Sequence, residues 1–376
     1  MSEPGHVRKT SSSWLLTPLF AIVLPVAAAA AVLFWLDPFE PVQIPVHSTS
    51  RSALAAAGTI RNDHMLRGSD KVGEGHMMGP EDLVYDAATG VVYTGCVDGW
   101  IKRVRLNDSV VEDWVNTGGR PLGLAFDQNG DLIVADADKG LLRVTRQKEI
   151  EVLVVENEGS KFRLTDGVDV AHDGTIYFTD ASSKYSIKDS ILDILEGNPN
   201  GRFMSYDPTT KRTTLLAHDL YFPNGVAVSP DQHFVVFCET ALVKCMKYFI
   251  RGPKKGSMEK FCDLPGLPDN IHYDGQGQYW IGIATAFGTD LDVLFRYPFL
   301  RKVLAIVTKH VPSLSVVKNG GVLAVDLEGK PTAYYYDPKL TLTSGIKIGN
   351  RLYCGSIIYP FLLRLDTEQY PALPAI

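Results

Sequence analysis

One unit of sequence recurs six times along this chain, and no other feature restricts the fold as strongly. Each copy contains a turn, an alternating apolar strand, a second turn built from Asp, Gly or Asn, and a strand rich in β-branched and aromatic residues. An apolar period of two is typical of half-buried strands, and Asp-Gly and Asn-Gly turns close hairpins. The copies begin near Gly79, Arg120, Leu164, Phe222, Leu267 and Thr343.

The spacing of the copies selects the architecture. Successive copies begin about 41 to about 76 residues apart, which suits one four-stranded blade per copy. A β-sandwich would not repeat one motif at this spacing, and a solenoid needs shorter, more regular units. We therefore predict an all-β fold, a six-bladed β-propeller. The segment Ile44–Ile60 is a candidate for a strand that closes the last blade onto the first.

A charge-free apolar segment, Trp14–Leu36, precedes the repeats. Its 23 residues, at about 1.5 Å of rise each, would cross a hydrocarbon core of roughly 30 Å. Arg8 and Lys9 lie before it and Asp37 follows it, so the positive side should stay in the cytosol. A long, cleaved signal peptide is the alternative.

The expected organisation follows from this order of segments. It comprises a cytosolic tail (1–13), a transmembrane signal anchor (14–36), a stalk with the candidate closing strand (37–60) and the propeller (61–376). We expect a single-pass type II protein of the endomembrane system, in the endoplasmic reticulum first, with the vacuole or plasma membrane as alternatives. The propeller would be luminal or extracellular, where Asn107, in the sequon Asn-Asp-Ser, could be glycosylated. A net charge of −6 gives no reason to expect a nucleic-acid partner.

Two insertions interrupt the repeats. Ser186–Glu196 is predicted to form one amphipathic helix, and Leu291–Val307 places apolar residues on one face at helical spacing. Packing over the propeller is the expected role of the second insertion, and a lid or a membrane-surface helix is the alternative. Cys238 and Cys245 flank a predicted hairpin turn and could pair if they lie opposite each other.

Aligning the repeats on themselves reveals a chemical pattern in the turn before each first strand. Four of the six equivalent positions carry an oxygen ligand, and the first strand of every blade lines the central channel of a propeller. Such side chains should converge on the axis. The equivalent residues are Glu81, Leu122, Asp166, Asn224, Asp269 with Asn270, and Thr343.

Carboxylates and amides without Cys or His form a hard-oxygen ligand set that suits Ca²⁺. Without a cation, neighbouring carboxylates would repel one another and shift their pKa values. Turn chemistry is the alternative for each residue alone, because Asp and Asn side chains mimic backbone turns. We expect a calcium or polar-substrate site formed by Glu81, Asp166, Asn224, Asp269 and Asn270.

The ordered motifs GPEDLVYD, GWIKRV, RPLGLAFD, LTDGVDVA, FPNGVAVS and LPDNI resemble the strictosidine synthase-like proteins, which include the adipocyte plasma membrane-associated proteins. The likeness covers roughly residues 41 to 366. It extends more distantly to the paraoxonase and gluconolactonase group of calcium-dependent propeller hydrolases. The resemblance implies metal ligands at Glu81, Asn224 and Asp269, and less directly at Asp166 and Asn270.

The departures from this family pattern limit the chemistry. Strictosidine synthase needs a catalytic glutamate just before the equivalent of Asn350, where this chain has Thr343 and no carboxylate between Thr341 and Asn350. Paraoxonase-type enzymes carry a histidine where Leu122 stands. A condensing synthase lacks its base here.

Two functions from different classes are therefore expected. The first is a calcium-dependent hydrolase of small esters or lactones, in which Asp269 or Glu81 orients or deprotonates water. The second is a non-catalytic binding or scaffolding propeller whose calcium stabilises the fold.

Overall fold

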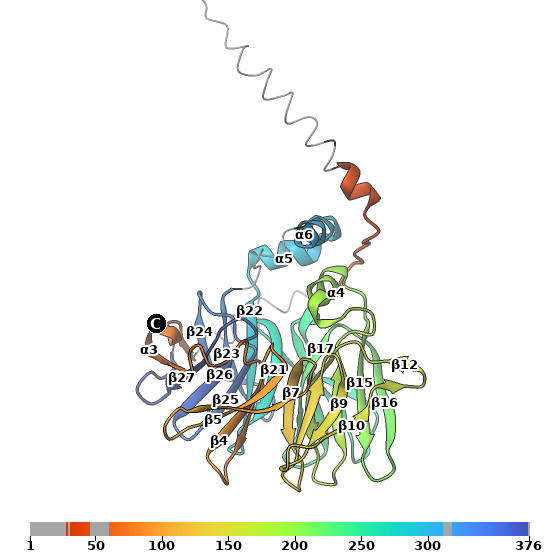
Figure 1. The fold of residues 1–376 in the computed structure, drawn as a ribbon. Helices are drawn as coiled ribbons and strands as arrows, with labels where there is room; N and C mark the ends of the chain where they lie inside the picture. Colours follow the sequence, from red (N-terminus) through yellow and green to blue (C-terminus); the bar gives the residue numbers. More distant parts are fainter. Residues whose placement is uncertain (1–27, 29–30, 46–59, 311–317, 375–376) are drawn as a thin grey trace, which may run out of the picture.

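The computed structural model describes residues 28, 31–45, 60–310 and 318–374. Six antiparallel sheets are arranged around a central axis, with a group of helices at one end (Figure 1). The first strands of successive blades contact one another all the way round, in the order β3, β7, β13, β17, β21, β25 and back to β3. This closed ring confirms the predicted six-bladed propeller.

The first three blades consist of consecutive strands. Their bounds are β3 (Leu83–Asp86), β4 (Val91–Gly95), β5 (Trp100–Arg105) and β6 (Val111–Asn116); β7 (Pro121–Phe126), β8 (Leu132–Asp136), β9 (Gly140–Val144) and β10 (Ile150–Val154); and β13 (Thr165–Val170), β14 (Ile176–Asp180), β15 (Gly201–Asp207) and β16 (Arg212–Leu220). A two-stranded ribbon, β11 (Glu156–Asn157) and β12 (Ser160–Lys161), lies between the second and third blades in the sequence.

The fourth blade also consists of consecutive strands, whereas the fifth and sixth blades add strands from the ends of the chain. Their bounds are β17 (Pro223–Val228), β18 (Phe234–Glu239), β19 (Lys244–Phe249) and β20 (Met258–Asp263); β21 (Gly266–Tyr273), β22 (Gln278–Ala286), β23 (Gly320–Asp326) and β24 (Pro331–Asp337), extended by β1 (Ile60–Asn62) and β28 (Leu373–Pro374); and β25 (Ser344–Ile348), β26 (Arg351–Gly355), β27 (Leu362–Asp366) and β2 (Ser69–Val72).

The strand that closes the ring lies later than the sequence suggested. β2 pairs antiparallel with β27 and so supplies the outer strand of the sixth blade. Within the candidate range Ile44–Ile60, residues 46–59 lie outside the described residues, and Ile60 belongs to β1, which pairs parallel with β24 of the fifth blade. The outer strand of the sixth blade is therefore β2, which lies after the candidate range. Its charged, weakly patterned sequence Ser-Asp-Lys-Val carries little strand signal.

Both predicted insertions form helices at one end of the propeller. The first forms a 3₁₀ turn, Ile187–Asp189, followed by α4 (Ser190–Glu196). The second forms two helices, α5 (Thr289–Arg296) and α6 (Pro298–His310), instead of one. The break falls at Tyr297, which is extended because the following Pro298 disfavours a helical conformation in the residue before it. Two further short elements are α3 (Met65–Gly68) and a 3₁₀ turn at Thr240–Leu242.

The predicted membrane anchor lies mostly outside the described residues. Of Trp14–Leu36, the structure describes residue 28 and residues 31–36. In the part of the chain that is described, no helix has the length and apolar character needed to cross a bilayer.

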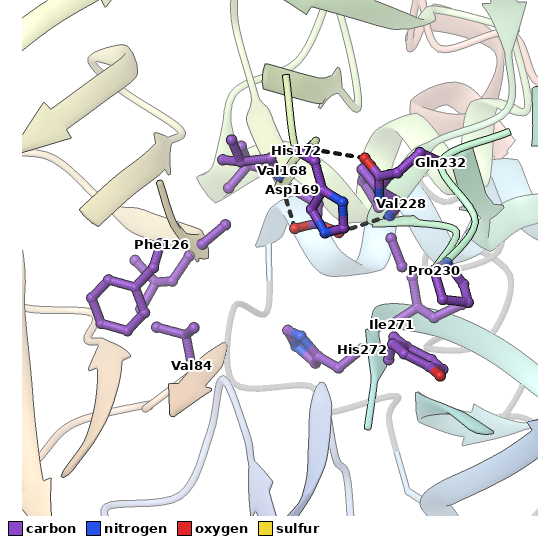
Figure 2. Close-up of a pocket in the computed structure, with 16 residues that line it drawn as sticks. Val84, Phe126, Val168, Asp169, His172, Val228, Pro230, Gln232, Ile271 and His272 are labelled. Atoms are coloured by element: carbon purple, nitrogen blue, oxygen red, sulfur yellow. Dashed lines mark hydrogen bonds between the residues drawn. The ribbon is translucent and has the colours of Figure 1, made fainter. Parts of the chain in front are cut away.

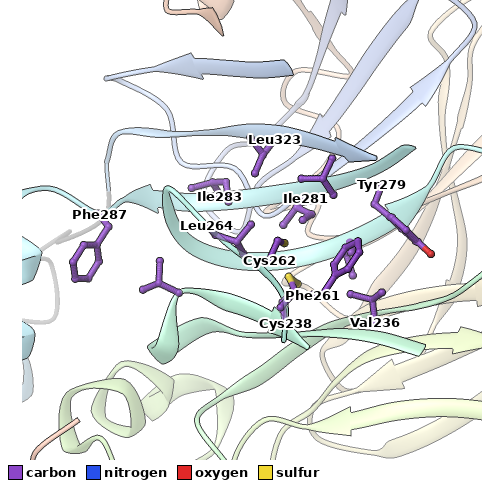
Figure 3. Packing of buried hydrophobic residues seen from close by; sticks show 14 of the residues in the cluster. Val236, Cys238, Phe261, Cys262, Leu264, Tyr279, Ile281, Ile283, Phe287 and Leu323 are labelled. Carbon is purple, nitrogen blue, oxygen red and sulfur yellow. A yellow bond between two sulfur atoms is a disulfide. The ribbon is translucent and has the colours of Figure 1, made fainter. Parts of the chain in front are cut away.

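Apolar side chains fill the spaces between blades. Figure 3 shows one such cluster between the fourth and fifth blades, where Val236, Phe261, Ile281 and Leu323 are buried together. The rings of Phe261 and Tyr279 meet edge to face with centroids 5.6 Å apart, a favoured aromatic geometry. These contacts hold neighbouring blades at a fixed angle and so fix the channel between them.

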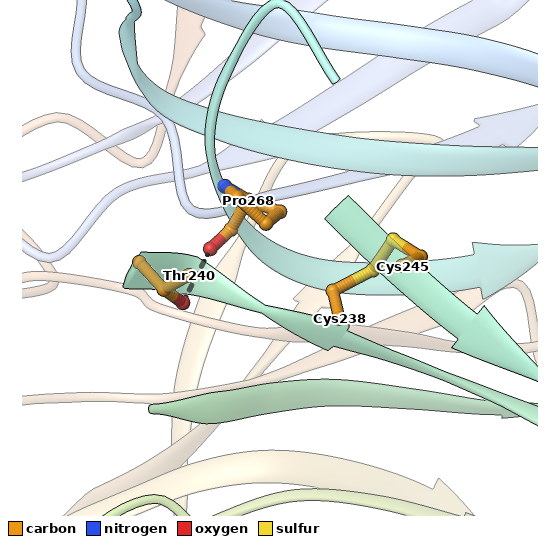
Figure 4. Close-up of a disulfide and its surroundings, with 4 residues drawn as sticks. All are labelled: Cys238, Thr240, Cys245 and Pro268. Carbon is orange, nitrogen blue, oxygen red and sulfur yellow. Dashed lines mark hydrogen bonds between the residues drawn. A yellow bond between two sulfur atoms is a disulfide. The ribbon is translucent and has the colours of Figure 1, made fainter. Parts of the chain in front are cut away.

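A disulfide joins Cys238 to Cys245 in the same region (Figure 4). The two residues are direct partners in the β18–β19 register, so the pairing that the hairpin spacing allowed is present. Cys96, Cys262 and Cys354 are buried free thiols.

Candidate functional site

A cavity of about 210 Å³ opens at the helical end of the channel. The helical insertion around α4 lines one side of it, with Ile187, Ile191 and Ile194. These side chains form an apolar wall of the cavity, and we call the polar part of its lining the floor. The floor contains Glu81, Asp166, Asn224 and Asp269, four of the five residues that the repeat alignment selected.

The fold thus brings residues from four blades to one cavity, as the alignment of the repeats predicted. Leu122, the apolar member of the equivalent set, lines the same cavity. Thr343, the sixth member of the equivalent set, is bonded to the backbone of Glu81: its hydroxyl donates to the carbonyl oxygen of Glu81 over 2.8 Å. Asn270 lies behind the floor, where its side-chain amide donates to Oε1 of Glu81 over 2.6 Å.

The glycines that follow Asp166 and Asn224 are required by close packing of the first strands. A Cβ atom on Gly167 would lie 2.3 Å from the carbonyl oxygen of Asn224, and one on Gly225 would lie 2.7 Å from that of Asp269. Neither glycine has a positive φ angle. The Asp-Gly and Asn-Gly pairs at these positions therefore allow adjacent first strands to approach closely, and they are not turn dipeptides.

Glu81 is the most enclosed member of the floor, with 2% of its surface exposed. Burial, followed by the charge of Asp82, raises the pKa of Glu81 to about 7. Its Oε2 atom is buried and has no hydrogen-bond donor among the described residues. Buried carboxylate oxygens are ordinarily satisfied, so this atom is open to a proton or a cation.

The carboxyl groups of Asp166 and Asp269 also have raised pKa values. Burial and then the charge of Glu81 raise the pKa values of Asp166 and Asp269 well above the ordinary range. Asn224 hydrogen-bonds to Asp269, while its own Oδ1 is buried without a donor. Figure 4 shows how β21 is held next to Asp269: the hydroxyl of Thr240 donates to the carbonyl oxygen of Pro268 over 2.7 Å.

Arg120 is a site residue that the sequence reasoning missed. It is 4% exposed, and its Nη2 donates to the carbonyl of Gly79 over 3.3 Å. Burial lowers its pKa, while the charges of Glu81 and Asp166 oppose that effect. Arg120 begins the second copy of the repeat, two residues before Leu122, and this position could have predicted that it lies near the floor.

The opposite end of the channel contains a second cavity, of about 460 Å³ (Figure 2). Nε2 of His272 lies 2.6 Å from Oδ1 of Asp82, which also accepts a hydrogen bond of 2.9 Å from Ser344. Burial lowers the pKa of His272, but the charges of Asp82 and Asp169 outweigh it and the net pKa is raised. His272 stands two residues after Asn270, and this period of two could have placed it on the axis.

The floor is not a purely acidic metal cluster. Among the residues the structure describes, no three His, Cys, Asp or Glu side chains are grouped closely enough to hold a metal ion. A cation at this floor would therefore need amide oxygens. Asn224, whose Oδ1 has no partner, and Glu81, whose Oε2 has none, line the same cavity and fit that requirement.

Two family descriptions match the chain, "Strictosidine synthase" over residues 166–253 and "Strictosidine synthase-like, N-terminal" over residues 61–104. The strictosidine synthase-like protein 7 of Arabidopsis thaliana is 48% identical over 361 residues, covering 94% of this chain and 96% of its own. The chain belongs to the strictosidine synthase-like family. The adipocyte plasma membrane-associated protein of Rattus norvegicus is 30% identical over 384 residues, with coverage of 93% and 99%.

Solved structures outside this strictosidine synthase-like family share its fold. A gluconolactonase from Xanthomonas campestris superposes with a TM-score of 0.59 at 18% identity, covering 88% of this chain and 99% of its own. A calcium-binding protein, regucalcin, from Agrobacterium tumefaciens gives a TM-score of 0.56 at 16% identity, with coverage of 78% and 92%. At these identities the likeness supports the propeller fold.

Proposed function

We propose that this strictosidine synthase-like propeller is a calcium-dependent hydrolase of small esters or lactones. The observation that carries the proposal is the floor of the helical-end cavity, where Glu81, Asp166, Asn224 and Asp269 meet beneath apolar side chains. The names of two structural neighbours, a gluconolactonase and a calcium-binding regucalcin, point to the same combination of metal and substrate.

The donor set supports calcium over other ions. Glu81 Oε2 and Asn224 Oδ1 are buried without donors, and the carboxyl groups of Asp166 and Asp269 resist ionisation together. Ca²⁺ takes carboxylate and amide oxygens in flexible numbers. When bound, it would polarise a substrate carbonyl and stabilise the developing negative charge.

The protein groups supply proton transfer and orientation. A carboxyl group with a pKa near 7 is suited to exchange a proton at neutral pH, and Glu81 has that value. Asp269 is half-buried and hydrogen-bonded by Asn224, so it is placed to orient a water molecule. The isoleucines around α4 would exclude bulk water and receive the apolar part of the substrate.

The proposal includes a cellular setting. Residues 14–36 would anchor the chain as a type II protein of the endomembrane system, with the propeller in the lumen. Asn107 is exposed in the turn between β5 and β6, where a glycan could be attached.

A panel of esters and lactones tests the function. The purified full-length chain should hydrolyse at least one of them, and a calcium chelator should abolish the activity, which added calcium should restore. Asp269→Asn should remove activity without altering the fold, because the substitution keeps the shape of the side chain. If no substrate is turned over while calcium still binds, the non-catalytic binding propeller replaces the hydrolase.

A further inference from the structure

In the helix α6, two basic side chains are buried while apolar side chains face outward, which is unusual for a surface helix. Arg301 is 0% exposed and Lys302 is 6% exposed, whereas Phe299 and Val303 are 57% and 45% exposed. A helix that covers a soluble domain places its apolar stripe inward and its charges outward. The outward face of α6 is therefore built for contact with something other than water.

The exposed apolar residues form one stripe over both cap helices. In α6 they recur at intervals of four, the spacing of one helix face. Val293 lies in α5, and Tyr297 lies in the extended link between the two helices. The stripe consists of Val293, Tyr297, Phe299, Val303 and Val307, each more than a third exposed.

Three basic side chains of α6, of which Arg301 and Lys302 are buried, connect the helix to the segment that follows the apolar N-terminal stretch. Nζ of Lys302 lies 2.7 Å from Glu40, and Nζ of Lys309 lies 2.9 Å from Asp37. Nη1 of Arg301 donates to the carbonyl of Leu195 over 2.9 Å, and Nη2 donates to that of Val42. These bonds connect α6 both to α4 and to residues 37–42.

The same contacts fix where α6 lies relative to the proposed anchor. Asp37 is the first charged residue after the charge-free stretch that ends at Leu36. Trp35 and Leu36 are 80% and 76% exposed and lie immediately before the ion pair with Lys309. Residues 31–36 are helical, and Figure 1 shows them at the same end of the propeller as α5 and α6. A chain leaving a bilayer at Leu36 would place α6 at the lipid–water interface.

We propose that the outward stripe of α5 and α6 lies on the lipid bilayer, beside the point where the N-terminal segment leaves it. This inference rests on the proposed anchor. Aromatic and aliphatic side chains on such a helix enter the boundary between headgroups and acyl chains, and Tyr297 and Phe299 are suited to that depth. The bilayer would thereby hold the helical end of the channel, and its cavity, next to the membrane surface.

Site-specific fluorescence on the full-length chain in phosphatidylcholine vesicles tests the proposal. Val303→Cys places one reactive thiol on the stripe, since the native free cysteines are buried. Ala88→Cys is the control, in the exposed turn between β3 and β4 at the far end of the propeller. Each variant is labelled with a nitrobenzoxadiazole probe and exposed to spin-labelled lipid or to aqueous iodide.

The probe at position 303 should lose about half of its emission to spin-labelled lipid and resist iodide, since an interfacial helix buries its apolar face in the headgroup region. The probe at position 88 should show the opposite pattern. Adding Val307→Asp should release the 303 probe into water. Equal iodide quenching at both positions overturns the proposal. Protection from iodide without lipid quenching also overturns it, and assigns the stripe to a second copy of the chain. An alkaline carbonate wash tests the anchor separately, because it extracts a chain that is only docked.

Discussion

The side-chain amide of Asn270 donates a hydrogen bond of 2.6 Å to Oε1 of Glu81, although 189 residues separate the two in the chain. Glu81 precedes the first strand of the first blade, and Asn270 lies in the first strand of the fifth. Thr343, before the sixth blade, donates to the backbone carbonyl of Glu81. Three blades on either side of the ring closure therefore meet at one residue, and the state of its carboxyl group is coupled to closure of the ring.

The stability of the calcium-free chain should fall as the pH rises from about 4.5 to about 7. Burial raises the pKa of Glu81 from 4.5 to about 7, so the folded chain holds a proton that the unfolded chain has released. Each unit of pKa shift corresponds to about 1.4 kcal/mol, so the part of the loss in the free energy of unfolding that Glu81 causes should be on the order of 3 kcal/mol. Urea denaturation at several pH values, with chelator present, measures it.

Glu81→Gln should flatten this dependence. The amide keeps an oxygen for Asn270 but has no proton to lose, and the raised pKa values of Asp166 and Asp269 leave a smaller slope of the same sign. Glu74→Gln is the matched control, because Glu74 is exposed and pairs with Lys71. An unchanged slope in Glu81→Gln would contradict the assignment.

Removing the imidazole of His272 should destabilise the propeller. His272 is bonded to the buried Asp82, and its raised pKa means that its contribution is complete below about pH 6.5 and is lost as the pH rises through the raised value. His272→Gln should lower the free energy of unfolding at pH 6 by about 2 kcal/mol, the usual magnitude for a hydrogen bond to a charged group. Urea denaturation at pH 6 and pH 9 should show the deficit shrinking at the higher pH.

His172→Gln provides the comparison for this prediction. His172 lines the same cavity, but it is the backbone N–H of this residue that bonds to Gln232. The substitution should have little effect at either pH. Equal losses in the two variants would show that His272 acts through packing alone.

The sequence was sufficient for the blades and for the residues of the cavity floor. The repeats predict both the blades and the floor, since equivalent positions in equivalent strands must point at the same axis. It was insufficient where the structure depends on one unrepeated contact. The short, polar β2 has no pattern of its own and is specified by its partner β27. Arg120 and His272 fall outside the aligned positions, so the alignment did not select them, although the folded channel brings both to the carboxyl groups.

The chain should not condense tryptamine with secologanin. The position where the family resemblance places a catalytic glutamate is Thr343, whose hydroxyl is already bonded to the carbonyl of Glu81. No carboxylate occurs between Thr341 and Asn350, and ring closure needs a base. Product formation by the purified chain should equal that of a boiled sample, measured by liquid chromatography with mass detection. Product above that level would show that another channel carboxylate can act as the base.

Calcium should stabilise the folded chain through the floor of the helical-end cavity. A ligand that binds only the native state adds about 2.7 kcal/mol to the free energy of unfolding at a hundredfold excess over Kd. Calcium should therefore raise the melting temperature relative to chelator. It should also reduce the pH dependence described above, because a cation replaces the proton that Glu81 otherwise holds. Melting curves at pH 5 and pH 7.5 separate the two effects.

Asp269→Asn should remove most of the calcium response, because it deletes a charge from the floor while preserving the shape of the side chain. In the absence of calcium the same variant should be at least as stable as the native chain, since the repulsion between Asp269 and Glu81 is gone. Leu122→Met is the control, because Leu122 lines the same cavity and offers no ligand; it should keep the full calcium response with a small cost in packing. If the native chain melts identically in calcium and in chelator, the floor holds a proton and no metal. The proposed hydrolase would then lack the cation that polarises the substrate carbonyl, and the proposal would be wrong.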